Sequence, residues 1–202
     1  MNIAILGAGN VGATLGKRFA EQGHAVSFGV PNPQKYASGE LSGTVGTVAE
    51  AAQTADIVLL AVPYNAVESA LRECGDLRGK ILIDATNPLA MTERGLALTA
   101  GFTTSGVEKI AALAPNAKLV KCFNQTGFGN MATPKQSVMF VCGNDAAANE
   151  TVRQLAAAIG FDAVSIGPLD KARLLEPLAM LWIHLSFTTE LGRDFAFRIQ
   201  RG

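Results

Sequence analysis

A glycine-rich turn near the start of the chain has the residue types and the spacing to bind phosphate groups. Gly7, Gly9 and Gly12 follow a short apolar segment and precede one with helical periodicity. Glycine permits a tight turn at the first position, close approach of a pyrophosphate at the second, and close helix packing at the third. The start of the helix also offers unpaired amides and a partial positive charge. We therefore predict a dinucleotide site formed by the whole turn, namely Gly7, Ala8, Gly9, Asn10, Val11 and Gly12.

The choice between NAD and NADP is expected at the end of the second strand, shortly after Phe28. An acidic residue there accepts hydrogen bonds from the ribose of NAD, whereas a cation neutralises the additional phosphate of NADP. The stretch between Glu21 and Glu40 contains no acidic residue, but it contains Asn32 and the cation Lys35. We predict NADP(H), with Asn32 and Lys35 near the adenosine ribose and NAD as the other possibility. In the alternative interpretation, Lys35 is an ordinary surface lysine.

Three other predicted strands end in small, apolar or amide side chains. Because ligands of open α/β sheets bind outside the carboxyl ends of the strands, these ends should border a nicotinamide ring. The same residues also have a purely structural interpretation, because Asn87-Pro88 is a pair that is common in turns and Asp84 could cap a helix. Cys122 could touch a ring, although a small buried thiol is the favoured interpretation. The predicted cofactor neighbours are Val62, Pro63, Tyr64, Thr86 and Asn87, and the predicted substrate neighbours include Cys122 and Asn124.

Side chains that could donate a proton to a substrate are scarce. Neither tyrosine is followed by lysine four residues later, and His24 lies in a loop where a structural role is favoured. His184 lies on a terminal helix, where packing is favoured over proton donation. Lys121 and Asn124 match a Lys-x-x-Asn pattern of hydroxyacid dehydrogenases, but the chain lacks their long helical substrate domain. We therefore predict hydride transfer between two rings, which depends mainly on positioning, with no catalytic acid or base and no metal.

Several stretches taken together resemble the deazaflavin-dependent NADP reductase family. The stretch Lys121-Cys-Phe-Asn124 is similar to the cytosolic oxidoreductase domain of the six-transmembrane metalloreductases, which itself resembles that family. The resemblance covers nearly the whole chain. It rests on residues 2–12, 61–63, 84–88, 141–145 and 167–173.

This resemblance implies a Rossmann domain with a small C-terminal part, bound NADP, and hydride transfer between nicotinamide and a stacked deazaflavin or flavin. It places the phosphate contacts on residues 8–11 and the nicotinamide near Val62, Thr86 or Asn87. The loop 124–127 also borders the ring, which adds Gly127 to the predicted substrate neighbours. At the adenosine phosphate the family has a Ser-Arg pair, and only Lys35 keeps the expected chemistry among Val30, Pro31, Asn32 and Lys35.

The elements that must position these residues alternate between short apolar runs and segments of helical period, which is typical of an α/β, doubly wound, mainly parallel sheet. We predict a Rossmann domain at 1–142 and a C-terminal helical extension at 143–202 that provides the substrate side and a dimer contact. A terminal helix is expected within 170–193, and the tail 193–202 suits an edge strand or a swapped arm. Strands are expected near 3–6, 25–28, 44–47, 57–62, 81–84, 118–122, 137–142 and 163–166, and further helices near 11–22, 65–73, 106–114 and 146–159.

The composition limits the partners of the chain. Seventeen Lys and Arg balance seventeen Asp and Glu, so there is no excess positive charge to bind nucleic acid or an anionic membrane. No apolar stretch reaches the roughly 20 residues of a membrane span, and the N-terminal run is too short for a signal peptide. Three widely spaced cysteines suit reduced thiols. We expect a cytoplasmic homodimer with a small-molecule redox partner.

Two other functions stay open at this point. One is reduction of an imine or small carbonyl, as in pyrroline-carboxylate reductases, which requires a proton donor that the sequence does not supply. The other is a binding module that senses NADP(H) without turnover.

Overall fold

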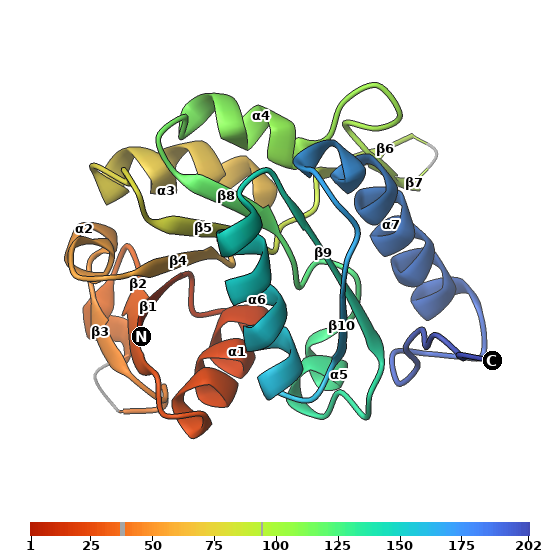
Figure 1. Ribbon diagram of the computed structural model, residues 1–202, viewed down its shortest axis with the longest axis horizontal. Helices are drawn as coiled ribbons and strands as arrows, with labels where there is room; N and C mark the ends of the chain where they lie inside the picture. The colour runs from red at the N-terminus through yellow and green to blue at the C-terminus, as the bar shows by residue number, and fades with distance from the viewer. Residues whose placement is uncertain (37–38, 94) are drawn as a thin grey trace.

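The computed structural model describes residues 1–36, 39–93 and 95–202, and its centre is an eight-stranded sheet (Figure 1). The strands lie in the order β10-β9-β8-β5-β4-β1-β2-β3. Neighbouring strands are parallel except for β8 and β9. The strand bounds are β1 Asn2–Leu6, β2 Ala25–Gly29, β3 Thr44–Gly46, β4 Ile57–Leu60, β5 Ile81–Asp84, β8 Lys118–Lys121, β9 Val138–Gly143 and β10 Asp162–Ser165.

Helices cover both faces of this sheet, which explains why its central strands are continuously apolar. All four residues of β4 are buried, for example. One face packs against α1 Asn10–Glu21, α5 Phe128–Ala132 and α6 Ala146–Ala158. The other packs against α2 Val48–Gln53, α3 Val67–Cys74 and α4 Gly106–Leu113. The predicted Rossmann-like α/β class is therefore confirmed.

The strand order reverses between β1 and β4, which places a crevice at the carboxyl ends of these two strands. From β1 the chain continues to β2 and β3 on one side, whereas β4 leads to β5 and β8 on the other. The glycine-rich turn follows β1 directly, and three 3-10 turns lie at η1 Pro33–Tyr36, η2 Tyr64–Ala66 and η3 Leu169–Lys171. The predicted site residues therefore gather around one edge of the sheet.

The antiparallel pairing of β8 with β9 is short and is extended by a side chain. Only Val120 and Lys121 of β8 have partners in β9. Beyond them, the Gln125 amide donates to the carbonyl of Phe140 (2.8 Å) and accepts from its N–H (2.9 Å). Gln125 therefore supplies the two hydrogen bonds of a ladder rung after β8 has ended.

The last helix, α7 Ala172–Thr188, contacts the end of β8 and then the loop that follows this strand. It passes through Pro177 without a break. Glu176 contacts Lys121, the final residue of β8. Farther along, the Trp182 ring packs against Gly127 in the loop after that strand.

The tail after α7 differs from the predicted edge strand or swapped arm. It has no strand and folds back on its own chain, where Val138 donates a hydrogen bond to Phe197 O (2.9 Å). Phe195 stacks on Trp182, with ring centroids 5.5 Å apart. The alternation of apolar and charged residues therefore reflects rings that face inward and charges that face solvent, such as Arg201, whose side chain is 64% exposed.

The sheet extends past the boundary that we place at residue 142. Strand β9 spans this boundary, and β10 pairs with β9 through four residues. Residues 146–165, which we assigned to the C-terminal extension, thus form part of the same sheet and its helical layer. Only the segment from η3 onward lies outside the alternation of strands and helices.

Candidate functional site

The glycine turn after β1 has the geometry that a dinucleotide requires. Gly7 has a φ of +97°, and a Cβ built on it would lie 2.7 Å from Ala61 O. A Cβ on Gly12 would lie 2.1 Å from Gly7 O, so only glycine lets α1 begin so close to the strand. A Cβ on Gly9 would meet nothing within 4 Å. The open side of the turn is therefore at Gly9, where a pyrophosphate would approach.

The first turn of α1 has backbone amides with no side-chain cap. Its N-cap residue is Gly9, and its first turn contains no acidic residue. Three other helices are capped by side chains: α2 by Thr47, α4 by Ser105 and α6 by Asp145. The first amides of a helix have no intrahelical acceptor, so those of α1 can donate to an anion. This uncapped turn fits a bound pyrophosphate.

The end of β2 lies beside this turn, because Gly7 N donates to Gly29 O (3.0 Å). Asn32 and Lys35 are both exposed there, and the Lys35 ammonium lies 5.7 Å from the centre of the Tyr36 ring. Val30 is buried, and its N–H donates to Gly46 O. Asn32 and Lys35 are thus the polar side chains that the predicted adenosine site presents to solvent.

The ends of β4 and β5 bring the other predicted cofactor neighbours to the same edge. Val62 is the side chain nearest Gly7, at 3.0 Å from a Cβ built there. Pro63 is exposed, and the half-buried Tyr64 donates from Oη to Gly106 O (3.3 Å). Burial, and after it the carboxylates of Glu176 and Asp84, raise the pKa of the Tyr64 hydroxyl. This tyrosine is therefore a neutral hydroxyl at neutral pH.

Thr86 and Asn87 are committed to structural hydrogen bonds. The Thr86 hydroxyl donates to Asp84 Oδ1 (2.7 Å), and its N–H donates to the same oxygen (2.9 Å). Asn87 Nδ2 donates to Asn124 O (2.9 Å), and Asn124 Nδ2 donates to Asn87 Oδ1 (3.0 Å). These two side-chain amides fix the loop after β5 to the loop after β8. That Thr86 or Asn87 also binds the carboxamide of the nicotinamide ring stays a prediction.

A buried ion cluster lies under this edge, and the sequence analysis did not predict it. Lys121 is completely buried, and its ammonium donates to Asp84 Oδ2 (2.7 Å), Thr86 O (2.7 Å) and Glu176 Oε1 (2.9 Å). Burial alone would lower the pKa of Lys121, but the two carboxylates raise it above its usual value. All three protons of the ammonium are engaged, so Lys121 has none free for the acid–base role of the Lys-x-x-Asn pattern.

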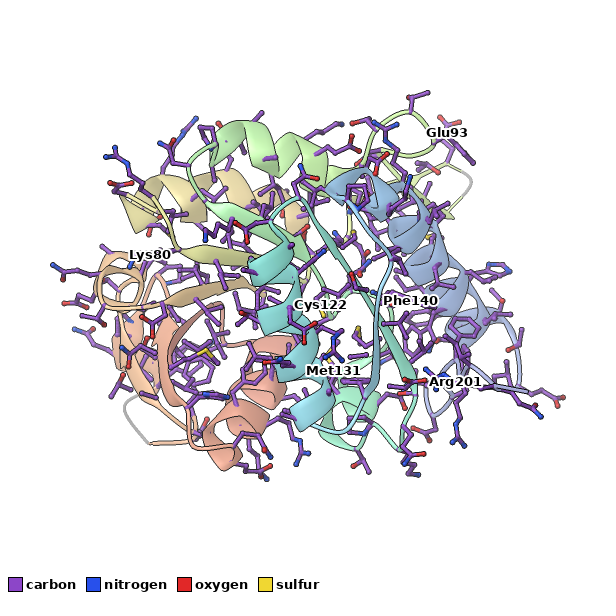
Figure 2. All side chains as sticks on the ribbon, in the orientation of Figure 1. Lys80, Glu93, Cys122, Met131, Phe140 and Arg201 are labelled. Carbon is purple, nitrogen blue, oxygen red and sulfur yellow. The ribbon has the colours of Figure 1, made fainter. Side chains whose placement is uncertain are left out.

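The predicted substrate neighbours after β8 differ in accessibility. Cys122 is completely buried, lies in the interior of the molecule in Figure 2, and has a pKa raised well above its usual value by burial. Asn124 is almost completely buried and is held by Asn87 and by Leu175 O (3.3 Å). Gly127 lines an open pocket. Of these three, Gly127 is thus the one that the structure exposes to a ligand.

This pocket has a volume of about 420 Å³ and a largely apolar lining. It lies between the loop after β8, the end of α7 and the start of the tail. The exposed ring of Phe187 stacks under Arg193, whose guanidinium carbon is 4.6 Å from the ring centre. The lining residues are Gly127, Phe128, Gly129, Trp182, Phe187, Arg193 and Asp194.

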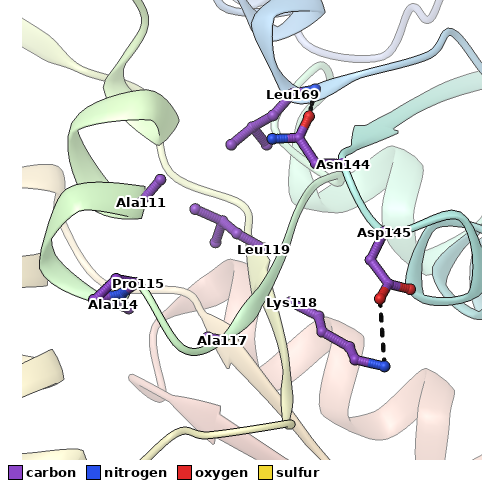
Figure 3. A pocket seen from close by; sticks show the side chains of 9 residues that line it. All are labelled: Ala111, Ala114, Pro115, Ala117, Lys118, Leu119, Asn144, Asp145 and Leu169. Atoms are coloured by element: carbon purple, nitrogen blue, oxygen red, sulfur yellow. Dashed lines mark hydrogen bonds and ion pairs between the residues drawn. The ribbon is translucent and has the colours of Figure 1, made fainter.

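A second hollow, of about 400 Å³, lies near the start of β8, at the opposite end of that strand (Figure 3). The ion pair between Lys118 and Asp145 spans 3.4 Å on one side of it, and Asn144 accepts a hydrogen bond from Leu169 N on the other. None of the predicted site residues lines it. It is separate from the candidate site.

Comparisons with known proteins place this geometry in a family. A family model described as NADP oxidoreductase, coenzyme F420-dependent, matches residues 2–88. The crystal structure of a candidate F420-dependent NADP reductase from Arthrobacter sp. FB24 is 32% identical, has a TM-score of 0.92, and is covered completely by this chain, as this chain is by it. The chain belongs to this family. The resemblance that we drew from the sequence is thus confirmed, and with it the class of NAD(P)-dependent oxidoreductases.

Two curated relatives extend the comparison. The metalloreductase STEAP3 of Rattus norvegicus is 31% identical over 187 residues, which are 89% of this chain but 37% of that protein. The F420-dependent NADP reductase of Methanocaldococcus jannaschii is 29% identical over 144 residues, which are 68% of this chain and 65% of the relative. The chain therefore spans little more than a third of the metalloreductase. Within the part of the chain that the structure describes, helix lengths and hydropathies give no candidate for a membrane span.

Proposed function

We propose that the protein transfers hydride between NADP(H) and the deazaflavin ring of coenzyme F420. The observation that carries this proposal is the uncapped first turn of α1, which opens to solvent at Gly9. It offers amides to a pyrophosphate without any side chain in the way. Membership of the F420-dependent family supports the deazaflavin as the second reactant, in preference to a flavin.

The residues of this chain then have distinct tasks. The amides of Asn10, Val11 and Gly12 bind the pyrophosphate, and Lys35 with Asn32 binds the phosphorylated ribose of the adenosine half. Lys35 is the cation that favours NADP over NAD at this position. The nicotinamide half lies over the ends of β4 and β5, at Val62, Pro63, Tyr64, Thr86 and Asn87.

The second ring is expected on the α7 side of this edge. The pocket beside Gly127 offers the Trp182 and Phe187 rings as an apolar wall and Arg193 as a cation. When both are bound, NADPH supplies hydride to the deazaflavin, and solvent supplies the proton that the reduced ring takes up. The protein contributes the positions of the two rings, since the hydroxyls of Tyr64 and Thr86 at the described edge already donate to Gly106 O and to Asp84.

We also propose that the chain acts as a cytoplasmic homodimer. Leu174 and Leu181 of α7, which are seven residues apart and so lie on the same side of the helix, are exposed by 65% and 47%, which leaves an apolar side of this helix in contact with water. Trp182 does not belong to this surface, because Phe195 of the tail covers it. The mass measured by light scattering should equal that of two chains, and Leu181→Glu should reduce the measured mass to that of one chain.

The decisive experiment follows NADPH oxidation at 340 nm with purified coenzyme F420, with a flavin, with a ferric chelate and with pyrroline carboxylate as separate acceptors. We expect turnover with F420 that exceeds turnover with each of the others. Tight NADPH binding without turnover on any acceptor would favour the sensing module. Preferred turnover with pyrroline carboxylate would favour the imine reductase.

A further inference from the structure

The buried cluster of Lys121, Asp84 and Glu176 holds two negative charges and one positive charge. All three side chains are at most 1% exposed, so water contributes little to their solvation. The carboxylates come from different parts of the fold, since Asp84 ends β5 and Glu176 lies on α7. Their counter-ion, Lys121, ends β8. The cluster therefore has a formal net charge of −1 beneath the edge of the sheet.

Hydrogen-bond donors surround both carboxylates. Asp84 accepts from the Thr86 N–H, the Thr86 hydroxyl and the Lys121 ammonium. Glu176 accepts from Gly106 N (2.8 Å), from Val107 N (3.2 Å) and from Lys121. Each carboxylate thus receives three donors, an arrangement that stabilises the charged form.

Other charges near the cluster do not cancel this excess. The amides of Gly106 and Val107 begin α4, whose positive end offsets part of the charge of Glu176. Arg173 and Glu108 lie nearby on α7 and α4, but they form a salt bridge with each other (2.6 Å) and add no net charge. Tyr64 contributes a neutral hydroxyl. The cluster retains a negative charge that no neighbouring cation neutralises in the part of the chain described.

The position of this charge relative to the crevice gives it a consequence. The strand order reverses between β1 and β4, so the nicotinamide half of a dinucleotide lies toward β4, β5 and β8. Asp84 and Lys121 end two of these strands, and Thr86 joins the cluster directly to the predicted ring neighbours. The oxidised nicotinamide ring is a cation, whereas the reduced ring is neutral.

We infer that the Asp84–Lys121–Glu176 cluster stabilises the oxidised nicotinamide and thereby favours NADPH as the hydride donor. This inference rests on the proposed function, because it requires NADP(H) in the crevice. It concerns relative affinity for the two redox forms, not catalysis by a residue that touches the ring. One unit of charge at a separation of about 12 Å, acting through an effective dielectric constant of about 20 to 40, changes such a ratio by about three- to tenfold.

The experiment measures dissociation constants for NADP⁺ and for NADPH and compares their ratio between variants. Glu176→Gln removes one charge at nearly constant volume, and we expect Kd(NADP⁺)/Kd(NADPH) to rise about three- to tenfold. Asp84→Asn removes the same charge from the sheet side and should raise the ratio in the same direction. Glu176→Asp retains the charge but withdraws the carboxylate from α4, so it should leave the ratio near that of the unaltered protein.

NADPH is measured by its fluorescence, NADP⁺ by competition, and folding by circular dichroism. A ratio that stays constant in a folded Glu176→Gln or Asp84→Asn protein would overturn the inference. An equal rise in Glu176→Asp and Glu176→Gln would also overturn it, because the cause would then be displacement of α7. If the unaltered protein binds neither form, the proposed function fails first, which separates the two outcomes.

Discussion

Two glycines of the same turn allow the binding of the cofactor to be separated from the stability of the fold. Gly9 has φ −75° and ψ −175°, which alanine adopts without strain, and a Cβ there meets nothing within 4 Å. Gly12→Ala, in contrast, would place its Cβ 2.1 Å from the backbone oxygen of Gly7, where ordinary contacts are 3.4–4 Å. The same change of one hydrogen to a methyl group therefore perturbs two different properties.

The magnitudes follow from these contacts. Relief of the clash in Gly12→Ala must move α1 or the turn by more than about 1 Å, and overpacking of this kind costs about 1–3 kcal/mol or more. For a chain of this size, the melting temperature should fall by about 3–10 °C. Gly9→Ala should leave the melting temperature within about 2 °C, because no contact of the free protein changes. Its methyl group instead occupies the side from which the pyrophosphate approaches, so the Kd for NADPH should rise at least about tenfold, or 1.4 kcal/mol.

The assay pairs thermal unfolding without ligand with isothermal titration of NADPH. Gly16→Ala is the matched control, because its Cβ would lie 2.3 Å from Phe28 Cζ, inside α1 and away from the open side of the turn. It should lower the melting temperature while the folded protein still binds NADPH. Unchanged NADPH affinity in Gly9→Ala would refute the assignment of the pyrophosphate to this turn.

Three further predictions concern charge and thiols. Lys35→Ala should weaken NADPH binding about tenfold and NADH binding little, and equal losses by titration would contradict a role on the phosphate. Hydrogen bonds from Arg173 lower the pKa of Glu108, and the Ala148 N–H lowers that of the helix cap Asp145. Both carboxyl groups then have lower pKa values in the folded than in the unfolded protein. Their contribution to the stability of the fold is therefore complete near neutral pH and is lost as the pH falls below about 4. A urea midpoint that stays constant from pH 6 to pH 3 would disprove this. Burial raises the pKa of Cys74 to about 11 and that of Cys142 to about 12, so a thiol reagent at pH 8 should label them only after denaturation, whereas rapid labelling of the native protein would contradict their burial.

Local patterns were sufficient to predict most of the sheet. Each predicted strand overlaps an observed one, because a short run of apolar residues between turns is a property of adjacent positions. The short helix α2 was not predicted, although Thr47 and Glu50 form a capping box that is visible in the sequence. Helix α5 and the hairpin of β6 Leu89–Thr92 with β7 Gly95–Leu98 were not predicted either, because they lie in stretches without a clear hydrophobic period.

The candidate site was predicted less completely, because its polar contacts join distant parts of the chain. The glycine turn is local, and its three roles follow from position alone. Lys121 meets Asp84 and Glu176 from 37 and 55 residues away, and no local pattern indicates that a lysine at a strand end is buried. The same distance explains why Asn87 and Asn124 could be placed at the right edge but not recognised as partners of each other. Composition, periodicity and spacing locate residues on elements, whereas the pairing of side chains depends on packing.

The direction of β9, which is antiparallel to β8, determines where the last helix begins. Because β9 runs opposite to β8 and β10 is parallel to β9, the chain after β10 turns at η3 beside the beginning of β8, and α7 then continues to the other end of that strand, where Glu176 contacts Lys121. With β9 and β10 parallel to β8, the same helix would start at the cofactor edge and lead away from it. The reversal therefore brings a terminal helix to the carboxyl end of β8, where it lines the pocket beside Gly127. We expect substitutions in α7 and the tail to reshape the pocket beside Gly127 without altering the glycine turn, because α7 and the tail line that pocket and the turn does not.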